Sequence, residues 1–206
     1  MKLKRIVLFT ALVLLAAAIY GNAVISDFKG KVEVRSPGGA WRTAAAGMTV
    51  ELADTISTGF GASAVLSLGS NNVIVSSLTR MTLDAFLEKE GTVDTKLFLR
   101  VGAVRAQVDD SGAKRQNFSI SSPYSTASVR GTEFAFDGKK LNVFKGSVAL
   151  LLAGSAQRRR GAGGPPAGGD DGDDGDGEGD GSAVVVNEGQ SIQVDVDFST
   201  GTATVT

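Results

Sequence analysis

The stretch Ala127–Phe136, ASVRGTEFAF, decides how the surrounding chain is interpreted. Its two ends alternate apolar residues with small or polar ones, as a half-buried β-strand does. An Arg-Gly-Thr-Glu quartet interrupts this alternation at the centre, although glycine and glutamate are depleted in strands. Three interpretations compete: a catalytic group, a ligand-binding turn, or a structural staple that lets the chain turn a corner.

Short apolar runs of the same kind fill the chain on both sides of this stretch. They are rich in Val, Leu, Ile and Phe, have period 2, and are separated by Gly, Asn or Ser. The predicted strands are 31–35, 64–68, 73–75, 81–86, 96–101, 103–108, 118–120, 141–144, 147–152, 183–186, 191–198 and 202–205. The sequence therefore predicts an all-β chain. Many short strands broken by single glycines suit a single β-roll or β-solenoid-like domain as well as a sandwich.

Composition narrows the possible chemistry. The chain has 206 residues, which fits one domain with an appendage, and it contains no histidine and no cysteine. Cysteine proteases, disulfide frameworks, cysteine zinc sites and histidine acid–base catalysis are therefore excluded. An enzyme of this composition would need serine with lysine, paired carboxylates or tyrosine.

The N-terminus resembles an export signal. Lys2, Lys4 and Arg5 precede the uncharged, mostly apolar run Ile6–Ile19, and small residues lead to a cleavage point after Ala23. We expect residues 1–23 to be a signal peptide that forms a helix. The alternative is an uncleaved membrane anchor, since the 20 residues Ile6–Ile25 are just long enough to cross a bilayer of about 30 Å.

Export without cysteine indicates a bacterial protein of the periplasm, the cell envelope or the exterior. Membrane association is expected only if the N-terminal segment is not cleaved. Residues 24–156 carry 15 Lys and Arg against 12 Asp and Glu, so the body is close to neutral. No basic field is present to attract nucleic acid.

Residues 157–182 differ from the rest of the chain. Three arginines lead into Gly and Pro and then into DDGDDGDGEGDG, with no large apolar residue. We predict a disordered acidic loop inserted between two strands of one domain, residues 24–206. Its spacing does not fit an EF-hand, so no cofactor is expected beyond weak Ca²⁺ association with residues 170–180.

One pair of residues suggests a serine hydrolase. Ser111 and Lys114 match the Ser-x-x-Lys pattern of serine β-lactam enzymes, in which the two residues lie one helical turn apart. Here they lie in the polar stretch DDSGAKRQ between two strands. We therefore expect a protein that is not an enzyme, with a hydrolase as the remote alternative.

The aromatic residues are expected in the core. Phe134, Phe136 and Phe144 alternate with small or polar neighbours. Trp41 follows a Pro-Gly-Gly turn, and burial is favoured over a role as an exposed binding anchor.

Several blocks of this sequence together resemble the FecR domain family. The strand, the proline, the small residues and the Val-Arg-Gly-Thr-Glu-Phe of residues 118–134 match the family's central pattern, with Ser122 in place of its usual threonine. Further blocks follow in the family's order: GKVEV at 30–34, DTISTG at 54–59, SAVLSLGS at 63–70, VFKGSV at 143–148 and NEGQSI at 187–192.

The resemblance implies an extracytoplasmic β-roll or β-solenoid module. The best-understood members are iron-uptake regulators in which a cytoplasmic anti-sigma segment and a membrane helix precede this domain, which receives a signal from an outer-membrane transporter. Only five residues precede the apolar segment here, so the anti-sigma role is not expected. We expect protein or ligand interaction, or signal sensing, with an unidentified envelope partner. The alternative is a structural or surface protein whose acidic loop binds cations or a partner.

The staple is the favoured interpretation of the opening stretch. Pro123 would end one strand, and Gly131 would give the backbone the freedom for a bulge or corner. Arg130 and Glu133 would pair, or bond exposed carbonyls, with the guanidinium buried. The predicted structural motif comprises Pro123, Val129, Arg130, Gly131, Thr132, Glu133 and Phe134.

Overall fold

The structure is a computed structural model that describes residues 23–89, 91–112, 114–153, 183–197 and 202–206. These residues form strands and turns, which confirms the predicted all-β class. They include no helix of the length and apolarity that crossing a membrane requires. The predicted signal before Ala23 and the predicted loop 157–182 lie outside the described residues and stay predictions.

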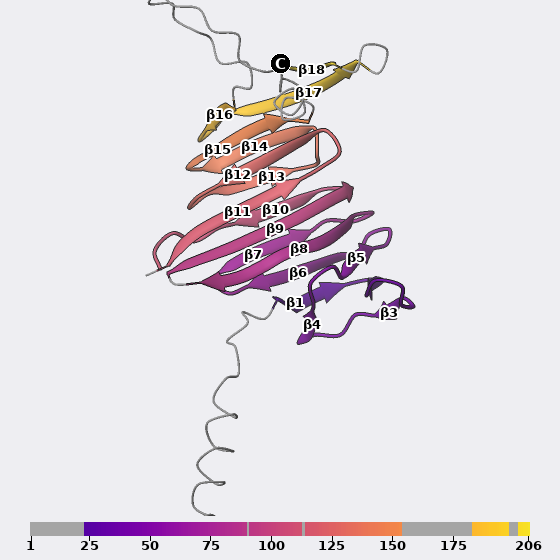
Figure 1. Cartoon of the computed structure of the whole chain (residues 1–206). Helices are drawn as coiled ribbons and strands as arrows, with labels where there is room; N and C mark the ends of the chain where they lie inside the picture. The colour runs from indigo at the N-terminus through magenta and orange to yellow at the C-terminus, as the bar shows by residue number, and fades with distance from the viewer. Residues whose placement is uncertain (1–22, 90, 113, 154–182, 198–201) are drawn as a thin grey trace, which may run out of the picture.

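The described strands form two sheets that lie face to face (Figure 1). Sheet A has the order β18 (Thr202–Val205), β17 (Ser191–Asp197), β14 (Lys140–Lys145), β13 (Glu133–Phe136), β10 (Val104–Gln107), β7 (Asn71–Val75), β6 (Ser63–Leu68), β1 (Ala23–Lys29), β4 (Met48–Val50). Sheet B has the order β16 (Val184–Asn187), β15 (Ser147–Leu152), β12 (Ser125–Val129), β11 (Arg115–Ser121), β9 (Thr92–Val101), β8 (Arg80–Lys89), β5 (Thr55–Thr58), β2 (Val32–Arg35), β3 (Arg42–Thr43).

The chain passes back and forth between the sheets as it advances along the stack. Figure 1 shows this advance, from β1–β4 at one end to β16–β18 at the other. Most neighbouring strands are antiparallel, whereas β9 and β11 pair in parallel. Successive parallel coils, as in a β-solenoid, are therefore not confirmed. The arrangement is a roll of two open, mostly antiparallel sheets.

Alternation along the strands builds the core. In β6, Ala64, Leu66 and Leu68 are buried between the sheets, while the residues between them face outward. Sheets that pack face to face need this period of two, because successive side chains point to opposite faces. The largest fully buried side chains are Phe118, Phe134, Phe136, Ile25, Ile56, Leu66, Leu68, Met81, Leu97, Leu99, Ile120 and Leu141.

Two aromatic residues expected in the core lie elsewhere. Phe144 is 44% exposed, and the guanidinium of Arg105 lies 4.4 Å from its ring centroid. Leu141 and Val143 of β14 face the core, so regular alternation points Phe144 outward, at the place where the β13–β14 register shifts. Trp41 is half-buried beneath Arg35, whose guanidinium carbon lies 4.6 Å from the ring centroid.

The turns form two rims along the stack. The registers place 59–62, 76–79, 101–103, 122–124 and 137–139 on one rim, which we call the hydroxyl rim because Ser and Thr hydroxyls bond its backbone. The opposite rim contains 69–70, 109–112, 114, 130–132 and 146, and we call it the motif rim.

Candidate binding site

The seven residues of the predicted motif are divided between the two rims. Pro123 is exposed in the β11–β12 turn of the hydroxyl rim. The other six lie at the motif rim, where the chain crosses from sheet B to sheet A: Val129, Arg130, Gly131, Thr132, Glu133 and Phe134. Val129 ends β12 and Phe134 lies in β13, and both are buried.

Gly131 makes the crossing possible. Its φ of +62° lies in the left-handed region that residues with a Cβ disfavour. A Cβ at this position would lie 2.3 Å from Oδ2 of Asp110. The next residue, Thr132, accepts a hydrogen bond of 2.9 Å from the Val108 amide through its carbonyl, which ties the crossing to the end of β10. The chain therefore turns a corner here, against its neighbour.

The predicted role of Arg130 is wrong, because its side chain is exposed rather than buried. Glu133 pairs with Arg105 instead: its Oε1 accepts bonds from Nε at 3.0 Å and from Nη2 at 2.5 Å. The register of β10 against β13 explains this pairing. Gln107 lies directly opposite Glu133, and Arg105, two residues away on the same strand, is therefore a diagonal neighbour of Glu133. A cross-strand neighbour on the same face therefore replaces the expected partner.

The residues of the motif rim line two small cavities. Arg130 faces one of about 260 Å³ with Lys114, Arg115 and Asp110, while Gly131, Thr132 and Glu133 line another of about 220 Å³. Among the described residues, no three acidic side chains lie together as a metal site would need. These cavities are smaller than the one on the hydroxyl rim.

Ser111 and Lys114 do not form a catalytic pair. The Ser111 hydroxyl donates to Oδ1 of Asp109 at 2.7 Å, and the Lys114 ammonium pairs with Glu88. Hydrogen bonds from the Ser111 side chain and backbone lower the pKa of Asp109, so this carboxyl is a poor base. The geometry does not activate the serine as a nucleophile.

Hydroxyl groups hold the opposite rim together. Thr58 Oγ1 donates to the Ser76 carbonyl at 2.5 Å and accepts from the Thr79 amide at 3.0 Å. Thr79 Oγ1 in turn bonds the Ala103 carbonyl at 3.1 Å and the Ala103 amide at 3.0 Å. Ser122 Oγ donates to the Gly138 carbonyl at 2.8 Å. Adjacent turns are thus cross-linked by side-chain oxygens.

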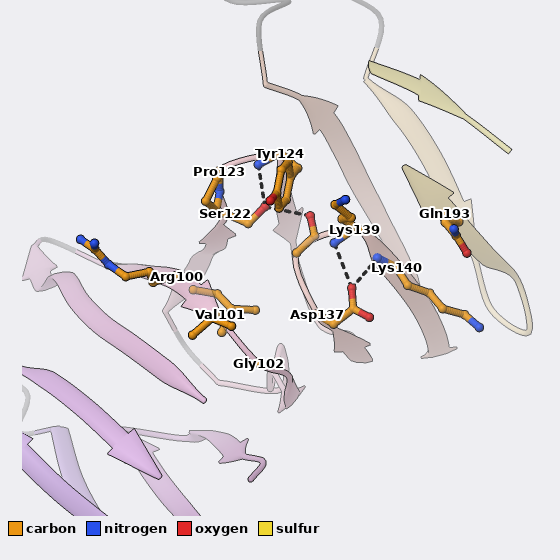
Figure 2. A pocket seen from close by; sticks show the side chains of 12 residues that line it. Arg100, Val101, Gly102, Ser122, Pro123, Tyr124, Asp137, Lys139, Lys140 and Gln193 are labelled. Carbon is orange, nitrogen blue, oxygen red and sulfur yellow. Dashed lines mark hydrogen bonds between the residues drawn. The ribbon is translucent and has the colours of Figure 1, made fainter. Parts of the chain in front are cut away.

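A pocket of about 470 Å³ opens on this rim (Figure 2). Its wall combines strand ends and turns from both sheets: β9 with the turn after it, the β11–β12 turn, the β13–β14 turn and β17. The lining residues are Leu99, Arg100, Val101, Gly102, Ser122, Pro123, Tyr124, Asp137, Gly138, Lys139, Lys140 and Gln193.

The pocket carries more positive than negative charge. Arg100, Lys139 and Lys140 line it, and Asp137 is the one acidic residue among its lining side chains. The Asp137 carboxylate accepts the backbone amides of Lys139 at 2.9 Å and Lys140 at 2.6 Å, which fixes the turn. The Lys139 ammonium lies 4.5 Å from the centroid of the Tyr124 ring. This arrangement suits an anionic group that also offers an apolar surface.

The sequence did not point to this pocket beyond Pro123. Arg100, Tyr124 and Lys140 are far apart in the chain, and only the strand pairing brings them together. The one available signal was chemical, because the turns Ser-Pro-Tyr and Asp-Gly-Lys-Lys contain an aromatic residue and two cations.

Comparison with known families gives a match to part of this chain. The family described as FecR protein matches residues 54–149, which run from just before β5 into β15. Two crystal structures of a candidate anti-sigma factor from Parabacteroides distasonis, at 1.65 and 2.50 Å resolution, are similar to this chain. The TM-score is 0.48 for both and the identity 12% and 13%, over 74% of this chain and 58% of that one. This chain thus spans less than two thirds of their length. No curated protein matches it.

Proposed function

We propose that this chain, in which residues 54–149 form a FecR domain, is an exported, non-enzymatic interaction and sensing module of the bacterial envelope. The family match is the observation that carries the proposal, because it covers both rims and the larger part of both sheets. The export pattern of residues 1–23 supports a location in the periplasm or cell envelope.

The contacts of the described residues favour binding over catalysis. The one sequence pattern that suggested a hydrolase has its serine bonded to Asp109 and its lysine paired with Glu88. The pocket that Pro123 lines is instead an open, cationic and aromatic surface on turns. Rigid scaffolds commonly present binding residues on turns of this kind.

In-cell cross-linking tests this proposal. The tagged full chain is produced in its bacterium, and intact cells are treated with an amine-reactive cross-linker that enters the envelope but not the cytoplasm. We expect discrete adducts with an envelope protein. A chain without residues 1–23 is the control, and it should stay in the cytoplasm and give none.

Two results would count against the proposal. The first is a full chain that fractionates with the cytoplasm or gives no adduct. The second is covalent labelling of Ser111 by a fluorophosphonate or a penicillin, because a binding module has no activated serine.

A further inference from the structure

Exposed apolar side chains line up along the hydroxyl rim. Phe60 is 90% exposed, Leu78 59% and Val101 57%, and Pro123 is exposed in the next turn. We call these four residues the apolar ridge. Single exposed apolar residues are ordinary on protein surfaces, but a contiguous set commonly marks an interaction site.

Hydrogen bonds and a shared pocket place the turns that carry the ridge next to one another. The Leu78 amide donates to the Gly59 carbonyl at 3.2 Å, so the turns that carry Phe60 and Leu78 touch. Thr79 Oγ1 bonds Ala103, which joins the Leu78 turn to the one after Val101. Val101 and Pro123 then line the same pocket. Side chains distant in sequence thus follow one another along the stack.

Leu78 is the least expected member of the ridge. Its φ of +55° lies in the left-handed region that suits Gly or Asn and is uncommon for a branched apolar residue. Neighbouring turns of this rim have glycine in that region, as at Gly61 and Gly102. Leu78 is also mostly exposed, so core packing does not account for it. A partner that contacts the side chain would offset both the backbone strain and the exposure.

The ridge ends in the cationic pocket. Figure 2 shows Val101 and Pro123 on the wall, with Arg100 extending on one side and Lys140 on the other. The two ends of the ridge therefore differ, because the cationic pocket lies at one of them. A complementary ligand therefore has apolar groups along its length and a negative group near one end.

We propose that the hydroxyl rim binds an extended segment of a partner protein, with apolar side chains along the ridge and an acidic side chain or terminal carboxylate in the pocket. This inference rests on the proposed function and names the chemistry of its partner. A peptide fits better than a membrane surface, because the apolar groups form a line and the lining cations gather at one end.

A peptide selection tests the ridge directly. The purified protein is immobilised, and a phage-displayed library of random 12-residue peptides is enriched on it. We expect peptides that combine several apolar residues with at least one Asp, Glu or free carboxyl terminus. Leu78→Asn and Phe60→Ser should each weaken their Kd by about tenfold or more.

Matched variants separate the two parts of the surface. Arg100→Glu together with Lys140→Glu should weaken acidic peptides about tenfold, whereas Lys96→Glu, an exposed cation on the same β9, should not. Val185→Thr removes an apolar side chain with the same 59% exposure as Leu78, and binding should not change. Leu78→Asn should keep its melting temperature, because asparagine tolerates this φ.

Three outcomes would overturn the inference: a library that yields no common sequence, peptides that bind Leu78→Asn as tightly as wild type, or binding to phosphatidylglycerol vesicles without any peptide. The result also separates the two proposals. Ridge-dependent peptides without a cross-linked envelope protein would remove the proposed function alone. An envelope adduct that survives the ridge variants would remove the ridge alone.

Discussion

Arg130 lies where the chain crosses from sheet B to sheet A, yet its side chain is exposed, and Glu133 bonds Arg105 instead. Surface substitutions away from caps and networks usually change stability by less than about 0.5 kcal/mol. We therefore expect Arg130→Ala and Arg130→Lys to unfold in urea as wild type does. Phe134→Ala is the control, since its fully buried ring should cost about 3–5 kcal/mol. If Arg130→Ala lowered the free energy of unfolding by more than about 1.5 kcal/mol, Arg130 would have the structural role predicted from the sequence.

Asp84 offers a prediction about pH. It sits where the β8–β9 register shifts, beside an apolar cavity lined by Val50, Leu83 and Phe86. Partial desolvation of the carboxyl raises the pKa of Asp84 above its usual value of 3.8, although the residue as a whole is exposed, so the effect on stability is small. The folded state therefore holds the proton more tightly than the unfolded state, so this group favours folding at low pH and disfavours it once ionised.

We accordingly expect Asp84→Asn to melt at a higher temperature than wild type at pH 7. The difference should shrink as the pH falls through the raised pKa, and it should vanish below the usual value of 3.8, where both side chains are neutral. Calorimetry from pH 3 to pH 7 measures it. A gap that stays constant with pH would show that the effect comes from packing rather than from charge.

The limits of sequence reasoning at this scale are visible in two phenylalanines. Phe134 alternates into the core as predicted and is fully buried. Phe144 is exposed because Leu141 and Val143 of the same strand face the core, so the alternation along β14 points its side chain outward. Val143 and Phe144 are adjacent and both apolar, so local periodicity alone does not decide which of them faces the core.

At the scale of the element, serine and threonine hydroxyls bond the backbone of neighbouring turns, which is the role that the sequence predicted for Arg130. Thr79 is buried, and its Oγ1 bonds both the amide and the carbonyl of Ala103. Thr79→Val keeps the shape but leaves these backbone groups without that partner. We expect a loss of about 1–3 kcal/mol in the free energy of unfolding, measured with urea.

Thr95 provides the matched control for this substitution. It is fully buried in β9, and its Oγ1 has no hydrogen-bond partner among the described residues. Thr95→Val should therefore be neutral or stabilising, because it removes an unsatisfied buried hydroxyl. Equal losses at both positions would mean that the methyl group disturbs packing and that the bonds of Thr79 contribute little.

The elements themselves were partly predictable. The apolar half of β9 was expected at 96–101, whereas the strand begins at Thr92 and includes polar residues that pair with β8 and β11. The strands β1, β3, β4 and β5 were missed. The two or three residues of β3 and β4 carry too little periodicity to be recognised. Strand ends are set by the neighbouring ladder rather than by local composition.

At the scale of the whole molecule, the sequence predicted the all-β class but not the path of the chain between the two sheets. Alternation established that the chain is all-β, and glycines marked where it turns. The same kind of glycine occurs in hairpins, as at Gly138, and at crossings between the sheets, as at Gly131. Which of the two occurs depends on the face that the next strand must bury. The cationic pocket and the apolar ridge can therefore be recognised only from the three-dimensional path of the chain.

The connection between β15 and β16 allows a prediction for the entire chain. These strands pair directly, with Leu150 opposite Val184, although residues 154–182 separate them in sequence. The composition of residues 157–182, which make up most of this segment, predicts no fixed structure. Replacing its 29 residues with a four-residue Asn-Gly turn should then stabilise the fold by about 2 kcal/mol, because a shorter loop costs less entropy to close. The melting temperature should rise by roughly 4–8 °C.

A chain in which residues 154–182 are scrambled is the control for that replacement. It keeps the length and composition of the loop, so its melting temperature should equal that of wild type. A lower melting temperature for the shortened chain would mean that the segment packs against the sheets in the native protein. In that case the segment would contribute to the folded structure, and the roll would not be the whole of the folded domain.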